Sequence, residues 1–135
     1  MTGPASPSDL LDLSGRVVIV TGAGGGVGTG IVRRLMEAGA TVVAHTRESS
    51  TEHLLNLDGS PVSGVRADLA SPDGPAKVIE STLEMHDRVD GLVNNAATQS
   101  VVPFHEVTDE IWSETIDVNV TAVHRLTHLA AGAMR

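Results

Sequence analysis

Several residue types are absent or scarce in this chain of 135 residues. There is no cysteine, which excludes disulfide bonds and thiolate metal sites and fits a reducing compartment. With no tyrosine, one tryptophan and one phenylalanine, the core must be built from Val, Leu, Ile and Ala, as in helix-covered parallel sheets. Nine Lys and Arg against 17 Asp and Glu give a net charge of −8, which argues against binding to nucleic acid or an anionic membrane. No apolar run approaches the roughly 18 residues of a membrane helix.

The N-terminal stretch, residues 1–12, is rich in Pro and Ser near its start. It lacks the basic and apolar regions of a signal peptide, so we expect a flexible tail and a cytoplasmic protein. Residues 13–135 are enough chain for one hydrophobic core, and no repeat, linker or low-complexity tract divides them. We therefore expect residues 13–135 to belong to a single domain.

The most informative segment is a glycine-rich run, residues 17–28, which reads Val-Val-Ile-Val-Thr-Gly-Ala-Gly-Gly-Gly-Val-Gly. The branched apolar residues predict a strand buried on both faces, and the apolar spacing after residue 28 predicts a helix. Glycines between a strand and a helix let the backbone approach a pyrophosphate, whose charge is stabilised by the free N–H groups of the helix start. Val27 stands where G-x-G-x-x-G needs its third glycine, so the spacing is Thr-Gly-x-x-x-Gly-x-Gly instead. An ordinary flexible connection also collects glycine, and the rest of the chain must decide between the two.

Strands and helices alternate along the remainder of the chain. Strands are predicted at 16–20, 41–45, 61–67 and 88–94, and helices at 29–38, 49–57, 71–86 and from 109 nearly to the end. This alternation with short connections predicts an α/β fold, a Rossmann-like doubly wound parallel sheet. Right-handed crossovers give the strand order 3-2-1-4.

The end of the second predicted strand indicates which nucleotide is bound. NAD-binding folds usually carry an acid about 20 residues beyond the glycines. Thr46 occupies that position here and Arg47 follows. A hydroxyl and a guanidinium suit a 2′-phosphate, because Arg binds phosphate bidentately. NADP(H) is therefore favoured, and NAD(H) stays possible if Glu48 bonds the ribose and Arg47 is merely solvated.

Three further segments complete a pattern that resembles the short-chain dehydrogenase/reductase family. They are Asp68-Leu69 after the third strand, Asn94-Asn95-Ala96-Ala97 after the fourth, and Ile116-Asp117-Val118-Asn119-Val120 in the last helix. With the glycine run, this makes four motifs in order over about residues 13–135. Two positions depart from the family: Ala97 replaces a usual glycine, and Gly25 stands where NADP-using members often have Arg or Lys.

The resemblance implies roles for individual residues. Asp68 would bond the adenine amino group beside Leu69, although an Asp before Ser-Pro also suits a turn cap. Asn95 would tie strands together, and the small residues after it would line the cofactor. The cofactor-binding residues expected in this way are Thr21, Gly22, Gly24, Gly25, Gly26, Val27, Gly28, Thr46, Arg47, Asp68, Leu69, Asn95, Ala96, Ala97 and Val118.

In the last helix, the resemblance makes Asn119 the catalytic-tetrad asparagine, which supports a water in the proton relay. Asn119 falls on an apolar stripe that we expect to face the core, so the alternative is a buried amide satisfied by nearby backbone. That stripe contains Trp112, Ile116, Val123, Ala130 and Met134. A second stripe contains Val118, Ala122, Leu129 and Ala133. It indicates burial against a partner or against a missing part of the chain, and because the resembled family uses this helix between subunits, a homo-oligomer is expected.

Metal binding is not predicted. His124 and His128 have the i, i+4 spacing of a helical metal site, but no carboxylate completes a metalloprotease motif. Solvated histidines on a helix face are the simpler interpretation.

The family's remaining catalytic groups, a Ser and a Tyr-x-x-x-Lys pair, fall beyond the last helix of this chain. The sequence has no tyrosine, and its sole lysine, Lys77, belongs to a different helix. We therefore expect the N-terminal portion of a Rossmann-fold NAD(P)-binding domain, truncated after the fourth strand and following helix. The whole protein would be a dehydrogenase/reductase of small-molecule carbonyls or alcohols, and this chain alone would be inactive. The alternatives are a nucleotide-binding module without catalysis, a split-enzyme subunit that needs the missing C-terminal half, and a structural fragment with an empty loop.

Overall fold

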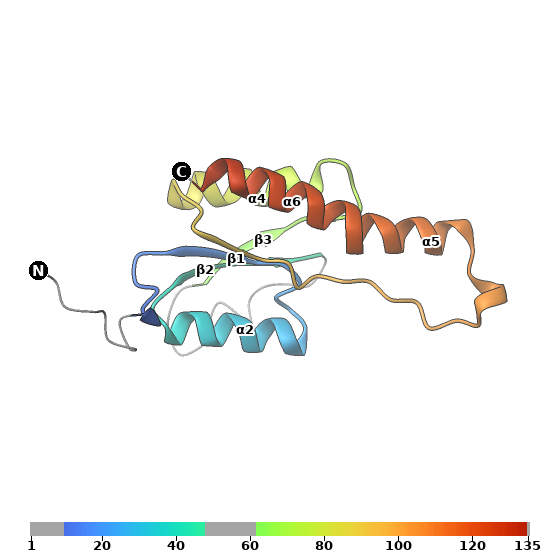
Figure 1. Ribbon diagram of the computed structural model, residues 1–135, viewed down its shortest axis with the longest axis horizontal. Coiled ribbons are helices and arrows are strands. Elements are labelled where there is room, and N and C mark those ends of the chain that lie inside the picture. The colour runs from blue at the N-terminus through green and yellow to red at the C-terminus, as the bar shows by residue number, and fades with distance from the viewer. Residues whose placement is uncertain (1–9, 48–61, 135) are drawn as a thin grey trace, which may run out of the picture.

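The computed structural model describes residues 10–47 and 62–134, which form a parallel sheet between two layers of helices (Figure 1). The strands are β1 (Val17–Val20), β2 (Thr41–Thr46), β3 (Ser63–Arg66) and β4 (Gly91–Val93). The helices are α2 (Gly26–Glu37), α4 (Gly74–His86), α5 (Asp109–Ile116) and α6 (Ala122–Ala133). A 3-10 turn, η2 (Phe104–Glu106), precedes α5, and a π turn, η3 (Asp117–Thr121), joins α5 to α6. The helix predicted at 49–57 and most of the predicted tail lie outside the described residues.

The sheet has the order β3-β2-β1-β4 and every pairing is parallel, which confirms the predicted Rossmann-like topology. The chain passes from β1 outward to β2 and β3 and then returns to β4 on the other side of β1. This reversal of direction beside β1 is the place where open α/β sheets form a ligand crevice, at the carboxyl ends of the strands.

Each face of the sheet has its own apolar core, as expected for strands covered on both sides. On one face, α2 packs Val32 against Val20, Val42 and Ala44. On the other face, α4 and α6 pack Val78 and Leu126 against the opposite side of the sheet. Figure 1 shows α2 on one side of the strands and α4 with α6 on the other.

The last helix buries a different face from the one that the sequence predicted. The buried residues are Val118, Ala122, Leu126 and Ala130, at most 8% exposed. From the stripe expected to face the core, Trp112 is 63% exposed and Met134 is 40% exposed, and Asn119 is also exposed. Of that stripe Ala130 is buried as expected, but the expectation is wrong for Trp112, Asn119 and Met134, because η3 inserts a π turn and so shifts the phase of α6 relative to α5.

The start of α4 also differs from the prediction. The helix begins at Gly74, three residues after the predicted start at residue 71. Ser71 instead forms a tight turn, in which its hydroxyl donates to the Asp68 carbonyl oxygen at 2.7 Å and accepts from the Gly74 amide at 3.0 Å. Pro75 then fits the first helical turn, where a missing N–H costs nothing.

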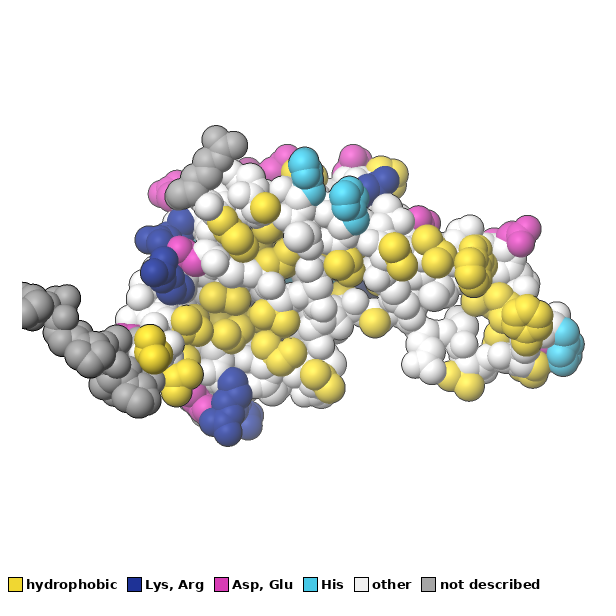
Figure 2. Space-filling model, in the orientation of Figure 1, with side chains coloured by type: hydrophobic (Ala, Val, Ile, Leu, Met, Phe, Trp, Pro, Cys, Tyr) yellow, Lys and Arg dark blue, Asp and Glu magenta, His cyan; other side chains and the backbone are white. Residues whose placement is uncertain are grey.

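Beyond β4 the chain runs in an extended path to η2 and α5, which project past the end of the sheet (Figure 1). Val101 and Phe104 of this arm are almost fully exposed. Figure 2 shows hydrophobic side chains gathered at the right-hand end of the molecule, where the arm lies in Figure 1. Within residues 10–47 and 62–134, no helix is both long enough and apolar enough to cross a membrane.

Candidate nucleotide-binding site

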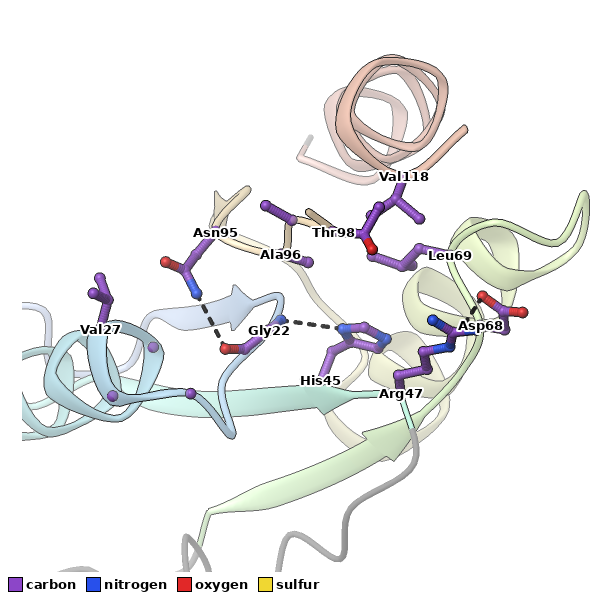
Figure 3. A pocket seen from close by; sticks show the side chains of 14 residues that line it. Gly22, Val27, His45, Arg47, Asp68, Leu69, Asn95, Ala96, Thr98 and Val118 are labelled. Atoms are coloured by element: carbon purple, nitrogen blue, oxygen red, sulfur yellow. Dashed lines mark hydrogen bonds and ion pairs between the residues drawn. The ribbon is translucent and has the colours of Figure 1, made fainter. Parts of the chain in front are cut away.

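A cleft of about 500 Å³ opens at the carboxyl ends of the strands (Figure 3). It is bordered by the loop before α2, the ends of β2, β3 and β4, and the π turn before α6. The residues that line it are Gly22, Gly25, Gly26, Val27, Gly28, His45, Arg47, Asp68, Leu69, Asn95, Ala96, Ala97, Thr98 and Val118. Twelve of these fourteen were predicted from the sequence to bind a cofactor.

Glycine is required at two positions of the loop. Gly22 has a φ of +63°, and a Cβ there would lie 2.7 Å from the Cα of Ala96. A Cβ at Gly28 would overlap the Gly22 carbonyl oxygen and lie 2.8 Å from the Cα of Ala23. The loop is therefore folded tightly against both β4 and the first turn of α2, in a way that larger residues cannot reproduce.

The start of α2 is bare. Gly25 is its N-cap and makes no side-chain cap bond, and no acidic residue stands in the first turn. A Cβ at Gly26 would meet nothing within 4 Å. The first N–H groups of a helix lack partners within the helix, and the helix dipole gives this end a partial positive charge. An anion in the cleft would meet this end of α2 directly.

Thr21 and Asn95 fix the loop to β4 from beneath the cleft. The Thr21 hydroxyl accepts from the backbone amides of Asn95 and Ala96 at 3.1 Å and 3.0 Å. The Asn95 side-chain amide donates to the carbonyl oxygens of Thr21 and Gly22, both at 3.1 Å. Thr21 itself is buried and does not line the cleft, so its part in the site is to hold the wall in place.

Arg47 extends from the end of β2 at the opposite end of the cleft. Its guanidinium lies 2.9 Å from the Glu114 carboxylate on α5 and 3.9 Å from the Asp68 carboxylate. The side chain is 52% exposed, so a ligand that carries an anionic group can reach it. The site therefore has a cationic group at one end and a bare helix start at the other.

Asp68 forms the turn cap weighed from the sequence and also borders the cleft. Its carboxylate accepts from the Ala70 amide at 3.0 Å, and its carbonyl accepts from Ser71, as in a turn cap. The residue also lines the cleft beside the buried Leu69. The turn thus positions an acceptor and an apolar wall at the carboxyl end of β3.

His45 and Thr98 also line the cleft, although neither was predicted from the sequence to bind the cofactor. His45 is 2% exposed, and its ring lies between Gly22 and Arg47 (Figure 3). Side chains alternate along a strand, and Thr46 is buried outside the cleft. This alternation predicts that His45 and Arg47, rather than Thr46, point into the cleft.

Four of the residues predicted for the site do not line the cleft in the described part of the chain: Thr21, Gly24, Thr46 and Asn119. Asn119 lies in the π turn and is paired with the backbone of Thr98. Its side-chain oxygen accepts from the Thr98 amide at 2.9 Å, and its amide group donates to the Thr98 carbonyl at 3.0 Å. This pairing anchors the end of the β4 loop to the last helix and so positions Thr98 at the rim of the cleft.

The histidine pair of the last helix lies elsewhere. The rings of His124 and His128 stack with centroids 6.3 Å apart on the exposed side of α6. In the ranges that the structure describes, no group of three or more His, Cys, Asp or Glu side chains is arranged to hold a metal ion.

Comparison with known proteins matches this chain over most of its length. The family described as short chain dehydrogenase matches residues 16–135. L-xylulose reductase from Homo sapiens is 39% identical over 121 residues, which cover 90% of this chain and 48% of that protein. The structure of L-sorbose reductase from Gluconobacter frateurii, complexed with NADPH and L-sorbose, is 31% identical, with a TM-score of 0.82 over 92% of this chain and 49% of that one. A metagenomic short-chain oxidoreductase in complex with NADP is 34% identical, with a TM-score of 0.82 over 90% of this chain and 57% of that one.

The fold and the cleft thus define a Rossmann-like α/β domain with a cleft at the carboxyl ends of its strands. This chain belongs to the short-chain dehydrogenase/reductase family of oxidoreductases. It spans about half the length of the curated relatives that it matches.

Proposed function

We propose that the cleft binds NADP(H), and that this chain forms the cofactor-binding part of an oxidoreductase that interconverts small-molecule carbonyls and alcohols. The observation that carries the proposal is the bare start of α2, which is open to the cleft and is held against it by two glycines that close packing requires, Gly22 and Gly28. Neither a turn nor a flexible linker needs such an arrangement, whereas a pyrophosphate does.

The residues of the cleft fit the parts of a dinucleotide in order. The amides at the start of α2 would hold the pyrophosphate, and Arg47 would hold a 2′-phosphate. Asp68 and Leu69 would receive the adenine, while Asn95, Ala96 and Ala97 would line the side toward the nicotinamide. The bound cofactor would supply or accept the hydride.

Support for NADP(H) over NAD(H) comes from the cation at the end of β2 and from relatives. NAD-binding folds usually have a carboxylate at the end of this strand. This chain has Thr46 at that position instead, and the guanidinium of Arg47, the next residue, borders the cleft. Two of the structural neighbours described above are complexes with NADP or NADPH.

The contribution of Asn119 to catalysis is part of the same proposal. Because both ends of its side chain bond the backbone of Thr98, it would act by fixing the rim of the cleft and the π turn. π turns occur frequently at functional sites. In the family that this chain resembles, the proton donor is a tyrosine with a neighbouring lysine. The sequence has no tyrosine, and Lys77 lies on α4, outside the cleft lining.

We therefore propose that the 135 residues alone bind the nucleotide but do not transfer hydride. A nucleotide-binding module or one subunit of a split enzyme is the second candidate, and the absence of tyrosine favours it for the isolated chain. Association with a C-terminal half, a homo-oligomeric state and a cytoplasmic location stay predictions.

The first test is a titration of the chain with NADPH and with NADH at pH 8, in which nucleotide fluorescence reports binding. We expect both to bind and NADPH to bind more tightly; absence of binding by either would refute the proposal. An assay of carbonyl reduction tests whether the chain alone is inactive, since turnover would show that a tyrosine is not needed. Native mass spectrometry then distinguishes a monomer of 14.0 kDa from an assembly.

A further inference from the structure

His45 is the one titratable side chain among the buried polar residues of the part that the structure describes. It is 2% exposed and lies next to the last residue of β2, at the base of the cleft. A buried imidazole must satisfy both ring nitrogens, and the way in which it does so fixes its protonation state.

The two ring nitrogens contact groups of opposite kind. Nε2 lies 2.9 Å from the carbonyl oxygen of Ala67, which can only accept, so Nε2 carries the hydrogen. Nδ1 accepts from the backbone amide of Gly22 at 3.3 Å (Figure 3). The ring is therefore the neutral Nε2–H tautomer, and it joins the glycine loop to the end of β3.

The backbone of His45 contributes a second bond to the same loop. Its carbonyl oxygen accepts from the Ala23 amide at 2.9 Å. Two successive amides of the loop thus bond to one residue of β2, while Asn95 holds the carbonyl of Gly22 from the β4 side. The first turn of the loop is clamped from both neighbouring strands.

Protonation of the ring would place a hydrogen on Nδ1, opposite the Gly22 N–H, so that two donors would face each other. Burial lowers the pKa of His45 below its ordinary 6.5, and the bond to Ala67 opposes this in part. The charged groups that share the cleft are Arg47 on the same strand and Asp68 at the end of β3, and Glu114 on α5 pairs with Arg47. The glycine loop, the segment from Asn95 to Thr98 and the π-turn residue Val118 contribute no ionisable group to the cleft lining.

We propose that His45 is a positioning residue for the nucleotide site: its neutral ring accepts the Gly22 N–H and holds the glycine loop in the binding shape, and protonation of the ring releases the loop. The inference rests on the proposed function, because it concerns how that same cleft binds a nucleotide. The affinity for a nucleotide should not change with pH above about 6.5, where the ring is neutral, and should fall at lower pH as the ring is protonated.

The test is calorimetric titration with ADP-ribose between pH 8 and pH 4.5, a range that extends well below 6.5 because burial lowers the pKa of His45. This probe carries the pyrophosphate but lacks a monoester phosphate, whose own ionisation near pH 6 would obscure the result. The affinity of the unmodified chain should fall on the order of fivefold, the worth of one hydrogen bond. His45→Asn retains an acceptor near the Nδ1 position that does not titrate, so its affinity should not change with pH. His124→Asn, on the exposed side of α6, is the control and should follow the unmodified chain.

Each outcome of this titration decides a separate point. Failure of the unmodified chain to bind ADP-ribose at pH 8 would refute the proposed function. Binding with an affinity that is constant over the pH range would refute the role of His45 alone. An affinity that rises as the pH falls would also overturn the inference, because the imidazolium would then attract the pyrophosphate directly.

Nitrogen-15 NMR of the unmodified chain tests the geometry without a variant or a nucleotide. At pH 7.5 the His45 ring should give the shifts of an unprotonated Nδ1 and a protonated Nε2. The Gly22 amide resonance should move with the same midpoint as the ring. The opposite tautomer, or a Gly22 amide that does not respond, would refute the inference even if His45→Asn failed to fold.

Discussion

Replacement of Arg47 by Ala should reduce the affinity for NADPH much more than the affinity for NADH. A hydrogen bond to a charged group contributes about 1.5–3 kcal/mol, or roughly 10-fold to 150-fold in affinity. The lower end applies here, because the Arg47 side chain is 52% exposed and already lies 2.9 Å from the carboxylate of Glu114. A 2′-phosphate must compete with that carboxylate. We therefore expect a loss of about tenfold for NADPH and less than twofold for NADH.

Glu114→Gln provides the matched variant. It removes the competing negative charge but keeps the side-chain size, so the affinity for NADPH should increase by about twofold to fivefold at low salt. Both variants should be titrated with NADPH and NADH at two salt concentrations, because the interactions of exposed charges are screened by salt. Equal losses for the two nucleotides in Arg47→Ala, or no effect of Glu114→Gln on NADPH, would refute the assignment of the phosphate to this end of the cleft.

Three further substitutions test other parts of the argument. Gly28→Val should abolish nucleotide binding, because the new side chain would overlap the Gly22 carbonyl oxygen. Gly132→Val is the control and should bind normally, because a Cβ at Gly132 would meet nothing within 4 Å. Equal nucleotide affinities of the two variants in a titration would contradict this prediction. Leu126→Ala should lower the free energy of unfolding in urea by about 2–5 kcal/mol, while Leu129→Ala, on a 36% exposed residue, should change it by less than about 1 kcal/mol. Asp90→Asn should weaken the acid dependence of the melting temperature. The pKa of Asp90 is held well below its ordinary 3.8 by bonds from Arg88, the Val17 amide and Arg16, so the stability from its ionised form is present above about pH 4 and lost as the pH falls further. An unchanged acid dependence would refute that account.

The fold was predictable because its signals are local. The four-residue apolar run of β1 followed at once by glycines determines a strand, a loop and a helix start without reference to the rest of the chain. The order of the strands then follows from right-handed crossovers. The first helix, predicted to end at residue 38, ends at Glu37 with Ala38 as its C-cap, and Gly39 follows with a φ of +90°, as is common just past a helix end.

The last helix shows where local reasoning failed. Its buried face was extrapolated from α5 with a constant helical period, and the π turn between α5 and α6 breaks that period. Leu126, one of the most buried side chains of the chain, belongs to neither predicted stripe. An insertion of this kind depends on contacts such as the pairing of Asn119 with Thr98, which join residues 21 positions apart.

The role of His45 was missed for a similar reason. The alternation of side chains along β2 could have placed His45 on the cleft side with Arg47, but nothing in the sequence indicates what its ring contacts. Its two ring contacts reach Gly22 and Ala67, which are 23 and 22 positions away, so only the assembled sheet brings them together. The cleft residues that were predicted belong to short continuous motifs, and those that were missed depend on packing between strands.

The bonds that Thr21, Asn95 and His45 make to the glycine loop have a consequence for how a ligand is received. The loop acquires its shape when the sheet forms, so the conformational entropy of ordering it is already lost before any nucleotide arrives. A nucleotide should then slow hydrogen exchange only slightly at Gly22 and Ala23, and more strongly where Arg47 must exchange Glu114 for a phosphate. It also couples the site to the centre of the sheet: separation of β1 from β2 or β4 would break the bonds that hold the loop and so would disorder the amides that would bind the pyrophosphate.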